Sequence, residues 1–158
     1  WFFISFSKIF SVPGYRVGYA IADSEIIEKL VLSSSTLYSC LPIFTQEGIL
    51  EGVGIIDEFT EMMRRKYKKI SLDCIEIIGS EKRLICRPPD SAFYLFIDIR
   101  KLEIDDLSFC SKLLEKYGTA LTPGSSFGRS GFVRASFCKD FSQVREGLMD
   151  LIAFSKEF

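Results

Sequence analysis

The sequence predicts an α/β protein in which an α+β layer domain is joined by a long helix to part of a second domain. Short strand patterns alternate with helical ones, and a long helical pattern over residues 43–71 divides the chain. The length of 158 residues has room for one domain with a core or for parts of two. An apolar fraction of 47% and a charged fraction of 26% are ordinary for a globular protein.

The first 42 residues are predicted to hold two strands and a helix. Residues 1–6 are rich in aromatic and β-branched side chains, and residues 16–22 repeat this pattern. Asp23 and Ser24 would cap a helix over residues 25–34, with Glu28 in a loose capping-box position, and the serines and threonine of 33–36 would end it. Because natural termini are usually polar and loosely held, a chain that opens in mid-strand is expected to be a fragment of a longer one.

The central helix is expected to run over residues 43–71. Its apolar residues follow the helical period: Ile49, Val53, Ile56, Phe59, Met63 and Tyr67. Gly48, Gly52 and Gly54 lower its helix propensity by up to ~1 kcal/mol each, so we expect close packing or a kink there.

The remainder is predicted to mix short strands with two helices. A helix beginning at Asp105 and Asp106 would run to Tyr117 and end at Gly118. Ser142 would cap a final amphipathic helix with an apolar face of Val144, Leu148, Leu151 and Ile152. Strand patterns cover residues 84–86, 93–98, 119–122 and 132–137.

Charge and histidine content exclude several classes of function. A net charge of −1 leaves no basic field that would gather nucleic acid or anionic lipid. No apolar run approaches the roughly eighteen residues that a membrane span needs. The chain contains no histidine, which excludes Ser-His-Asp and Cys-His catalysis. We therefore expect neither a nucleic-acid nor a membrane partner.

The cysteines indicate a reducing compartment. The five of them are odd in number, widely spread and without a CxxC pair: Cys40, Cys74, Cys86, Cys110 and Cys138. We expect reduced, mostly buried thiols in a cytoplasmic protein and no metal site.

Lys8 is the first candidate for chemistry. It lies where the opening apolar strand gives way to a loop, with Ser5 and Ser7 beside it and Arg16 eight residues on. A lysine that is partly desolvated has a lowered pKa and can form a Schiff base with an aldehyde. Serine hydroxyls and an arginine fork suit a phosphate, and pyridoxal phosphate requires both features together. On spacing alone, an exposed lysine and a structural arginine remain the alternative.

The wider pattern resembles a known family. Ser5-Phe6-Ser7-Lys8 followed by GYRVGY at 14–19 is similar to the S-x-S-K-x(5)-G-x-R-x-G-[YW] signature of class I and II aminotransferases, which are pyridoxal-phosphate enzymes of fold type I. Three further motifs follow in the family's order and extend the resemblance to nearly the whole chain. They are Pro42 with Gln46, PDSAFYLF at 89–96, and PGSSFG at 123–128 with GFVR at 131–134.

The resemblance implies a role for five residues. Lys8 would carry pyridoxal 5′-phosphate as a Schiff base and serve as general base and acid. Ser5 and Arg16 would bind the phosphate, with Ser7 a weaker candidate. Arg134 would bind the substrate's α-carboxylate, whose planar shape matches a guanidinium fork.

Other residues of the same motifs are expected to act on structure. Phe127 and Gly128 would shape the loop over the site, and the Phe93–Tyr94 pair would belong to the core. Gly14 and Gly18 would serve backbone geometry.

The resemblance also implies a domain plan and partners. Residues 1–42 would be the C-terminal part of a large cofactor-binding domain, 43–72 an interdomain helix, and 73–158 a small α+β domain. The full protein would be an aspartate aminotransferase-like homodimer acting on an amino acid and a 2-oxo acid. Because the residue that pairs with the pyridinium nitrogen would lie upstream, this chain alone is expected to be inactive.

Two alternatives share these motifs. One is another reaction on the same fold and cofactor, such as that of a lyase, decarboxylase or synthase. The other is a non-catalytic, aminotransferase-like sensor domain of a transcription regulator. Residues 33–39 contain no arginine for a distal carboxylate, which leaves the amino-acid specificity open, and Asp90-Ser91 replaces the family's usual small turn.

Overall fold

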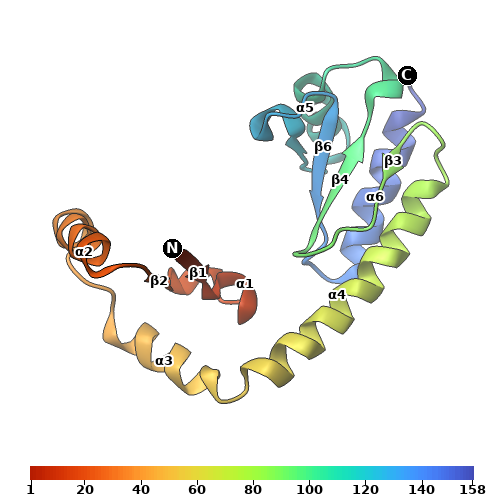
Figure 1. Ribbon diagram of the computed structural model, residues 1–158. Helices are drawn as coiled ribbons and strands as arrows, with labels where there is room; N and C mark the ends of the chain where they lie inside the picture. The colour runs from red at the N-terminus through yellow and green to blue at the C-terminus, as the bar shows by residue number, and fades with distance from the viewer. The chain divides into compact units, whose positions relative to one another are not determined.

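Two separate antiparallel sheets organise the chain (Figure 1). The computed structural model describes residues 1–158. It divides into two compact units, Trp1–Arg64 and Arg65–Phe158, each of which holds one sheet.

The first unit is built on a ribbon of β1 (Phe2–Ser5) and β2 (Gly18–Ile21), in which Ser5 lies opposite Gly18. Both predicted strands are present, within shorter bounds. A side chain at Gly18 would collide with the backbone oxygen of Ile4, so the close approach of the strands requires glycine there. A Cβ added at Gly14 would meet no atom within 4 Å beyond its chain neighbours, and the expected backbone role therefore applies to Gly18 alone.

The first unit also contains α1 (Phe6–Ile9), the 3₁₀ helix η1 (Pro13–Tyr15) and α2 (Ser24–Tyr38). The predicted end of α2 at residues 33–36 is wrong. The hydroxyls of Ser34, Ser35 and Thr36 donate to the carbonyls of Leu30 and Leu32 at 2.7 to 3.1 Å, so these side chains bond to the helix rather than compete with it. Asp23 occupies the N-cap without a side-chain hydrogen bond, and the expected capping box is absent.

The long central helix is interrupted, contrary to the expectation of one helix over residues 43–71. α3 (Ile43–Val53) ends beside Gly54, and α4 (Ile56–Gly79) begins two residues later. A Cβ on Gly52 would lie 3.1 Å from the ring of Phe10, which confirms the close packing expected at these glycines. No helix of the chain combines the length and apolar composition needed to cross a bilayer.

The second unit is organised by a four-stranded sheet in the order β3-β4-β6-β5. Its strands are β3 (Ile85–Cys86), β4 (Tyr94–Asp98), β5 (Thr122–Pro123) and β6 (Phe132–Ser136). All four predicted strands are found, although β5 begins only where the predicted strand ends. Along β4 and β6, buried residues alternate with more exposed ones, so one face of the sheet forms the core and the other stays accessible.

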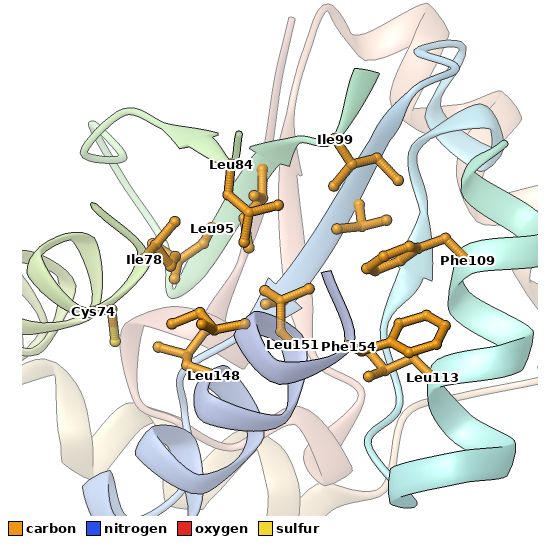
Figure 2. Packing of buried hydrophobic residues seen from close by; sticks show 14 of the residues in the cluster. Cys74, Ile78, Leu84, Leu95, Ile99, Phe109, Leu113, Leu148, Leu151 and Phe154 are labelled. Carbon is orange, nitrogen blue, oxygen red and sulfur yellow. The ribbon is translucent and has the colours of Figure 1, made fainter. Parts of the chain in front are cut away.

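Three helices cover the core face: the second half of α4, α5 (Asp106–Tyr117) and α6 (Phe141–Ser155). Figure 2 shows their apolar side chains meeting those of the strands, with Cys74 and Ile78 from α4, Phe109 and Leu113 from α5, and Leu148, Leu151 and Phe154 from α6. This single cluster gives the second unit a core of its own.

The ends of α5 match the prediction. The Asp105 carboxylate accepts the Ser108 N–H at 2.8 Å, and Gly118, with φ of 73°, donates its N–H to the Leu114 carbonyl at 2.9 Å. The predicted cap of α6 is wrong, because Asp140 rather than Ser142 occupies its N-cap. The apolar face predicted for that helix is buried.

All five cysteines are free thiols, but the expectation that most are buried is wrong. Cys74 and Cys110 are buried, Cys86 is half-buried, and Cys40 and Cys138 are exposed. Burial raises the pKa of Cys74, Cys86 and Cys110 to about 11. These three thiols are therefore poor nucleophiles at neutral pH.

Candidate active site

Lys8 lies in a one-turn helix rather than in a loop. α1 follows β1 directly, and its N-cap is Ser5, whose Oγ accepts the N–H of Ser7 at 3.3 Å. The side chain of Lys8 is exposed to solvent, so the partial desolvation expected of it is not seen. The end of β1 thus places a lysine and two serines within one turn of backbone.

Arg16 is brought toward the same end of the ribbon by the strand pairing. The ladder that sets Ser5 opposite Gly18 is extended by a hydrogen bond from the Phe6 N–H to the Val17 carbonyl at 3.2 Å. Arg16 comes just before Val17 and has a left-handed backbone with φ of 54°. One guanidinium N–H donates to the Pro13 carbonyl at 2.9 Å, which leaves the other donors of the fork for a ligand.

The donor set of this segment suits a phosphorylated aldehyde. Residues 1–22 contain Lys8 and Arg16 as cations and no aspartate or glutamate. Serine hydroxyls and a guanidinium are donors to phosphate oxygens, and a lysine amine is the group that adds to an aldehyde carbon. The residues present therefore fit pyridoxal 5′-phosphate.

Arg134 belongs to the second unit and lies on the accessible face of its sheet. It is opposite Phe96 in the β4–β6 ladder and opposite Thr122 in the β5–β6 ladder. Its guanidinium carbon lies 4.4 Å from the ring centre of Tyr94 and 4.2 Å from that of Phe127. No acidic side chain of residues 65–158 forms a salt bridge with it.

Asp106 holds the loop that carries Phe127. Its carboxylate accepts the N–H of Ser125 at 2.7 Å and that of Gly131 at 3.3 Å, and the residue is only 4% exposed. Burial would raise the pKa of Asp106, but hydrogen bonding from Ser125, through its backbone and its side chain, and from the Gly131 backbone outweighs burial and holds that pKa below its usual value. A side chain at Gly124, at the start of η3 (Gly124–Phe127), would collide with the carbonyl oxygens of Arg129 and Phe132, so this turn also requires glycine.

The sequence does not predict the contacts of two residues of this arrangement, Tyr94 and Asp106. Tyr94 was expected in the core, but it contacts Arg134 on the opposite face of the sheet. The alternation along β4 could have placed it there, because Tyr94 shares a face with Phe96 and not with buried Leu95. For Asp106 the sequence predicts only a role in starting a helix, and no local pattern indicates its long-range hydrogen bonds.

The second unit also has a pocket of about 430 Å³ away from these residues. It is lined by Thr119, Gln143, Gly147 and Asp150 among others, and the Thr119 hydroxyl donates to the Asp150 carboxylate at 2.6 Å. None of the predicted site residues lines it. This pocket is therefore separate from the predicted site residues.

Comparison with known proteins gives consistent matches. The family model for aminotransferase class I and II matches residues 2–151. A probable N-acetyl-LL-diaminopimelate aminotransferase of Bacillus subtilis is 34% identical over 150 residues, covering 94% of this chain and 38% of that protein. An aspartate aminotransferase of Thermotoga maritima is 32% identical over 143 residues, covering 90% of this chain and 36% of that protein.

Solved structures show the same likeness. The crystal structure of an aromatic aminotransferase from Pyrococcus horikoshii superposes with a TM-score of 0.89 and 27% identity, covering 98% of this chain and 42% of that one. The chain thus spans about two fifths of the length of the proteins it matches.

Proposed function

The chain belongs to the class I and II aminotransferase family, and from this premise we propose that it is the C-terminal part of a pyridoxal-phosphate-dependent aminotransferase. Its fold is that of the aspartate aminotransferase-like enzymes of fold type I, over the part that it covers. The whole protein would move an amino group between an amino acid and a 2-oxo acid. The proposal rests on one observation. The residues matched by the family model include both the cluster of Ser5, Ser7, Lys8 and Arg16 and the arginine Arg134, which has no acidic partner in its own unit.

The first unit would hold the cofactor. The amine of Lys8 would bind its aldehyde carbon, and Ser5, Ser7 and Arg16 would donate hydrogen bonds to its phosphate. When bound, pyridoxal phosphate supplies an electron sink for negative charge that develops at the substrate Cα. The Lys8 amine would remove the proton from that Cα and later return it.

Arg134 would orient the substrate. Its planar fork can donate two parallel hydrogen bonds to the α-carboxylate, which fixes the direction of the Cα–H bond. Contact with the rings of Tyr94 and Phe127 stabilises the positive charge of the guanidinium in this position.

The same proposal assigns residues 1–42 to a large cofactor-binding domain, 43–72 to an interdomain helix and 73–158 to a small domain. The whole protein would be a cytoplasmic homodimer. The exposed apolar side chains of the first unit support a missing partner surface: Phe2 and Phe3 are each 66% exposed on β1, and Leu37 is 78% exposed on α2.

Covalent labelling tests the role of Lys8. The longest natural chain that contains this sequence, loaded with pyridoxal phosphate, is reduced with borohydride and mapped by mass spectrometry. We expect the label on Lys8, its loss in Lys8→Ala, and no loss in Lys29→Ala, which removes an exposed lysine paired only with Glu25. A label on any other lysine would contradict the assignment.

Product analysis then separates the three reactions still open. Stoichiometric conversion of an amino acid and a 2-oxo acid into their exchanged partners supports the aminotransferase. Release of carbon dioxide or of an elimination product indicates another pyridoxal-phosphate reaction, and labelling without turnover indicates the sensor domain.

Arg134→Ala tests substrate binding in the same protein. Loss of a bidentate, charge-assisted contact would cost on the order of 3 kcal/mol of transition-state binding, or roughly a hundredfold in kcat/KM, while cofactor loading stays normal. Arg145→Ala, on an exposed position of α6, is the matched control. Equal wild-type rates with α-amino acids and with simple amines would exclude a carboxylate-binding role for Arg134.

A further inference from the structure

The guanidinium of Arg134 is contacted by two aromatic rings that come from different elements. Tyr94 belongs to β4 and Phe127 to η3, and both ring centres lie well within the ~6 Å at which a cation is attracted by a ring face. We call Tyr94 and Phe127 the aromatic clamp. Because guanidinium N–H bonds lie in the plane of the group, a guanidinium stacked on these rings would keep its N–H edges for a carboxylate.

A neighbouring arginine shows how the clamp differs from an ordinary surface contact. Arg100 lies 5.3 Å from the ring centre of Phe132, and it also donates to the Asp98 carboxylate at 2.7 Å. Its fork is therefore already occupied. Arg134 has two closer rings and no acid from its own unit, so its guanidinium remains available to a carboxylate from outside that unit.

Both parts of the clamp are held by the fold. The ring of Tyr94 lies 4.8 Å from that of Phe93, and the next residue, Leu95, is fully buried in the core. Phe127 is placed by its loop, whose amides at Ser125 and Gly131 donate to the buried Asp106 carboxylate. The rings can therefore restrict the guanidinium rather than follow it.

We propose that Tyr94 and Phe127 are positioning residues that fix the plane of the Arg134 guanidinium and direct its N–H edge at the substrate's α-carboxylate. The inference rests on the proposed function, in which Arg134 is the carboxylate ligand. In this proposal, the aromatic clamp enables the protein to distinguish an α-amino acid from the corresponding amine, which lacks the carboxylate.

Kinetics of the cofactor-loaded natural chain test the clamp. Tyr94→Leu and Phe127→Leu should each lower kcat/KM for the amino acid by about five- to thirtyfold, mainly through KM, and leave the rate with the matched amine unchanged. Phe127→Tyr, which keeps a ring, should recover most of the loss. The control is Phe96→Leu, which removes a ring from the same face of β4, opposite Arg134, that stacks on Phe132 instead. It should leave the ratio of amino-acid to amine rates unchanged.

A spectroscopic signal tests the geometry without turnover. In protein labelled with ¹⁵N-arginine, ring currents should shift the Arg134 Nε–H resonance upfield, and each leucine variant of the clamp should move it back toward the ordinary position. An unshifted resonance in the wild type, or equal losses with amino acid and amine, would overturn the clamp. If the resonance is shifted but the protein has no transaminase activity, the proposed aminotransferase function is wrong. Only the geometry of the clamp would then be supported.

Discussion

Replacing Asp106 with asparagine should loosen the loop that carries Phe127. The wild-type carboxylate accepts two backbone N–H groups, from Ser125 at 2.7 Å and from Gly131 at 3.3 Å, in a site that is 4% exposed. Asparagine has one oxygen acceptor. Its NH₂ group would therefore face one of these backbone donors, and a buried N–H would lose its partner.

The magnitude follows from the two contacts. A hydrogen bond to a charged group contributes about 1.5–3 kcal/mol, and the longer bond to Gly131 contributes at the low end or less. Asparagine keeps one of the two as a weaker neutral bond. We therefore expect Asp106→Asn to lower the free energy of unfolding at pH 7 by about 2–3 kcal/mol.

Urea denaturation of the natural chain measures this loss, and hydrogen exchange at the amides of Ser125 and Gly131 locates it. Asp105→Asn is the matched control, because the neighbouring carboxylate accepts the exposed Ser108 N–H as a helix cap. Asparagine caps helices about as well as aspartate, so this variant should stay within about 0.5 kcal/mol of wild type and leave the loop amides protected.

The effect has a defined pH dependence. Because hydrogen bonding from Ser125 and Gly131 holds the folded-state pKa of Asp106 below its unfolded value of about 3.9, the carboxylate stabilises the fold fully above that pH. This contribution is lost as the pH falls through the folded-state pKa. The difference between wild type and Asp106→Asn should thus be largest near neutrality and shrink below about pH 4. A difference that does not vary with pH, or one below 0.5 kcal/mol at pH 7, would refute the role of the charge.

Two further changes have clear outcomes. Gly18→Ala should destabilise the protein by about 2 kcal/mol or more in thermal unfolding, because its Cβ would meet the backbone oxygen of Ile4, whereas Gly14→Ala, with open space around it, should stay within about 0.5 kcal/mol. Alkylation at neutral pH, followed by mass spectrometry, should modify the exposed Cys40 and Cys138 first, since burial raises the pKa of the Cys74 thiol to about 11. Early labelling of Cys74 in the folded protein would contradict its burial.

Elements whose signals lie within a few residues were predictable. Asp105 and Gly118 define both ends of α5 because an N-cap acceptor and a left-handed C-terminal glycine act on the adjoining turn. Where two local signals compete, as at the end of α2, the prediction from the sequence was wrong. The hydroxyls of residues 34–36 could have ended α2, but they bond to carbonyls of the helix and allow it to continue to Tyr38.

The same distinction applies to the candidate site. Ser5, Ser7 and Lys8 share one turn, and a single strand pairing carries Arg16 toward them, so a motif in the sequence was enough to group them. The surroundings of Arg134 are different, because its rings come from residues 94 and 127 and the loop anchor comes from Asp106. These contacts form only when the strands have paired and α5 has packed against the sheet. The residues that flank Arg134 and Asp106 in the sequence do not indicate these contacts, because the contacts depend on how distant elements pack in the folded protein.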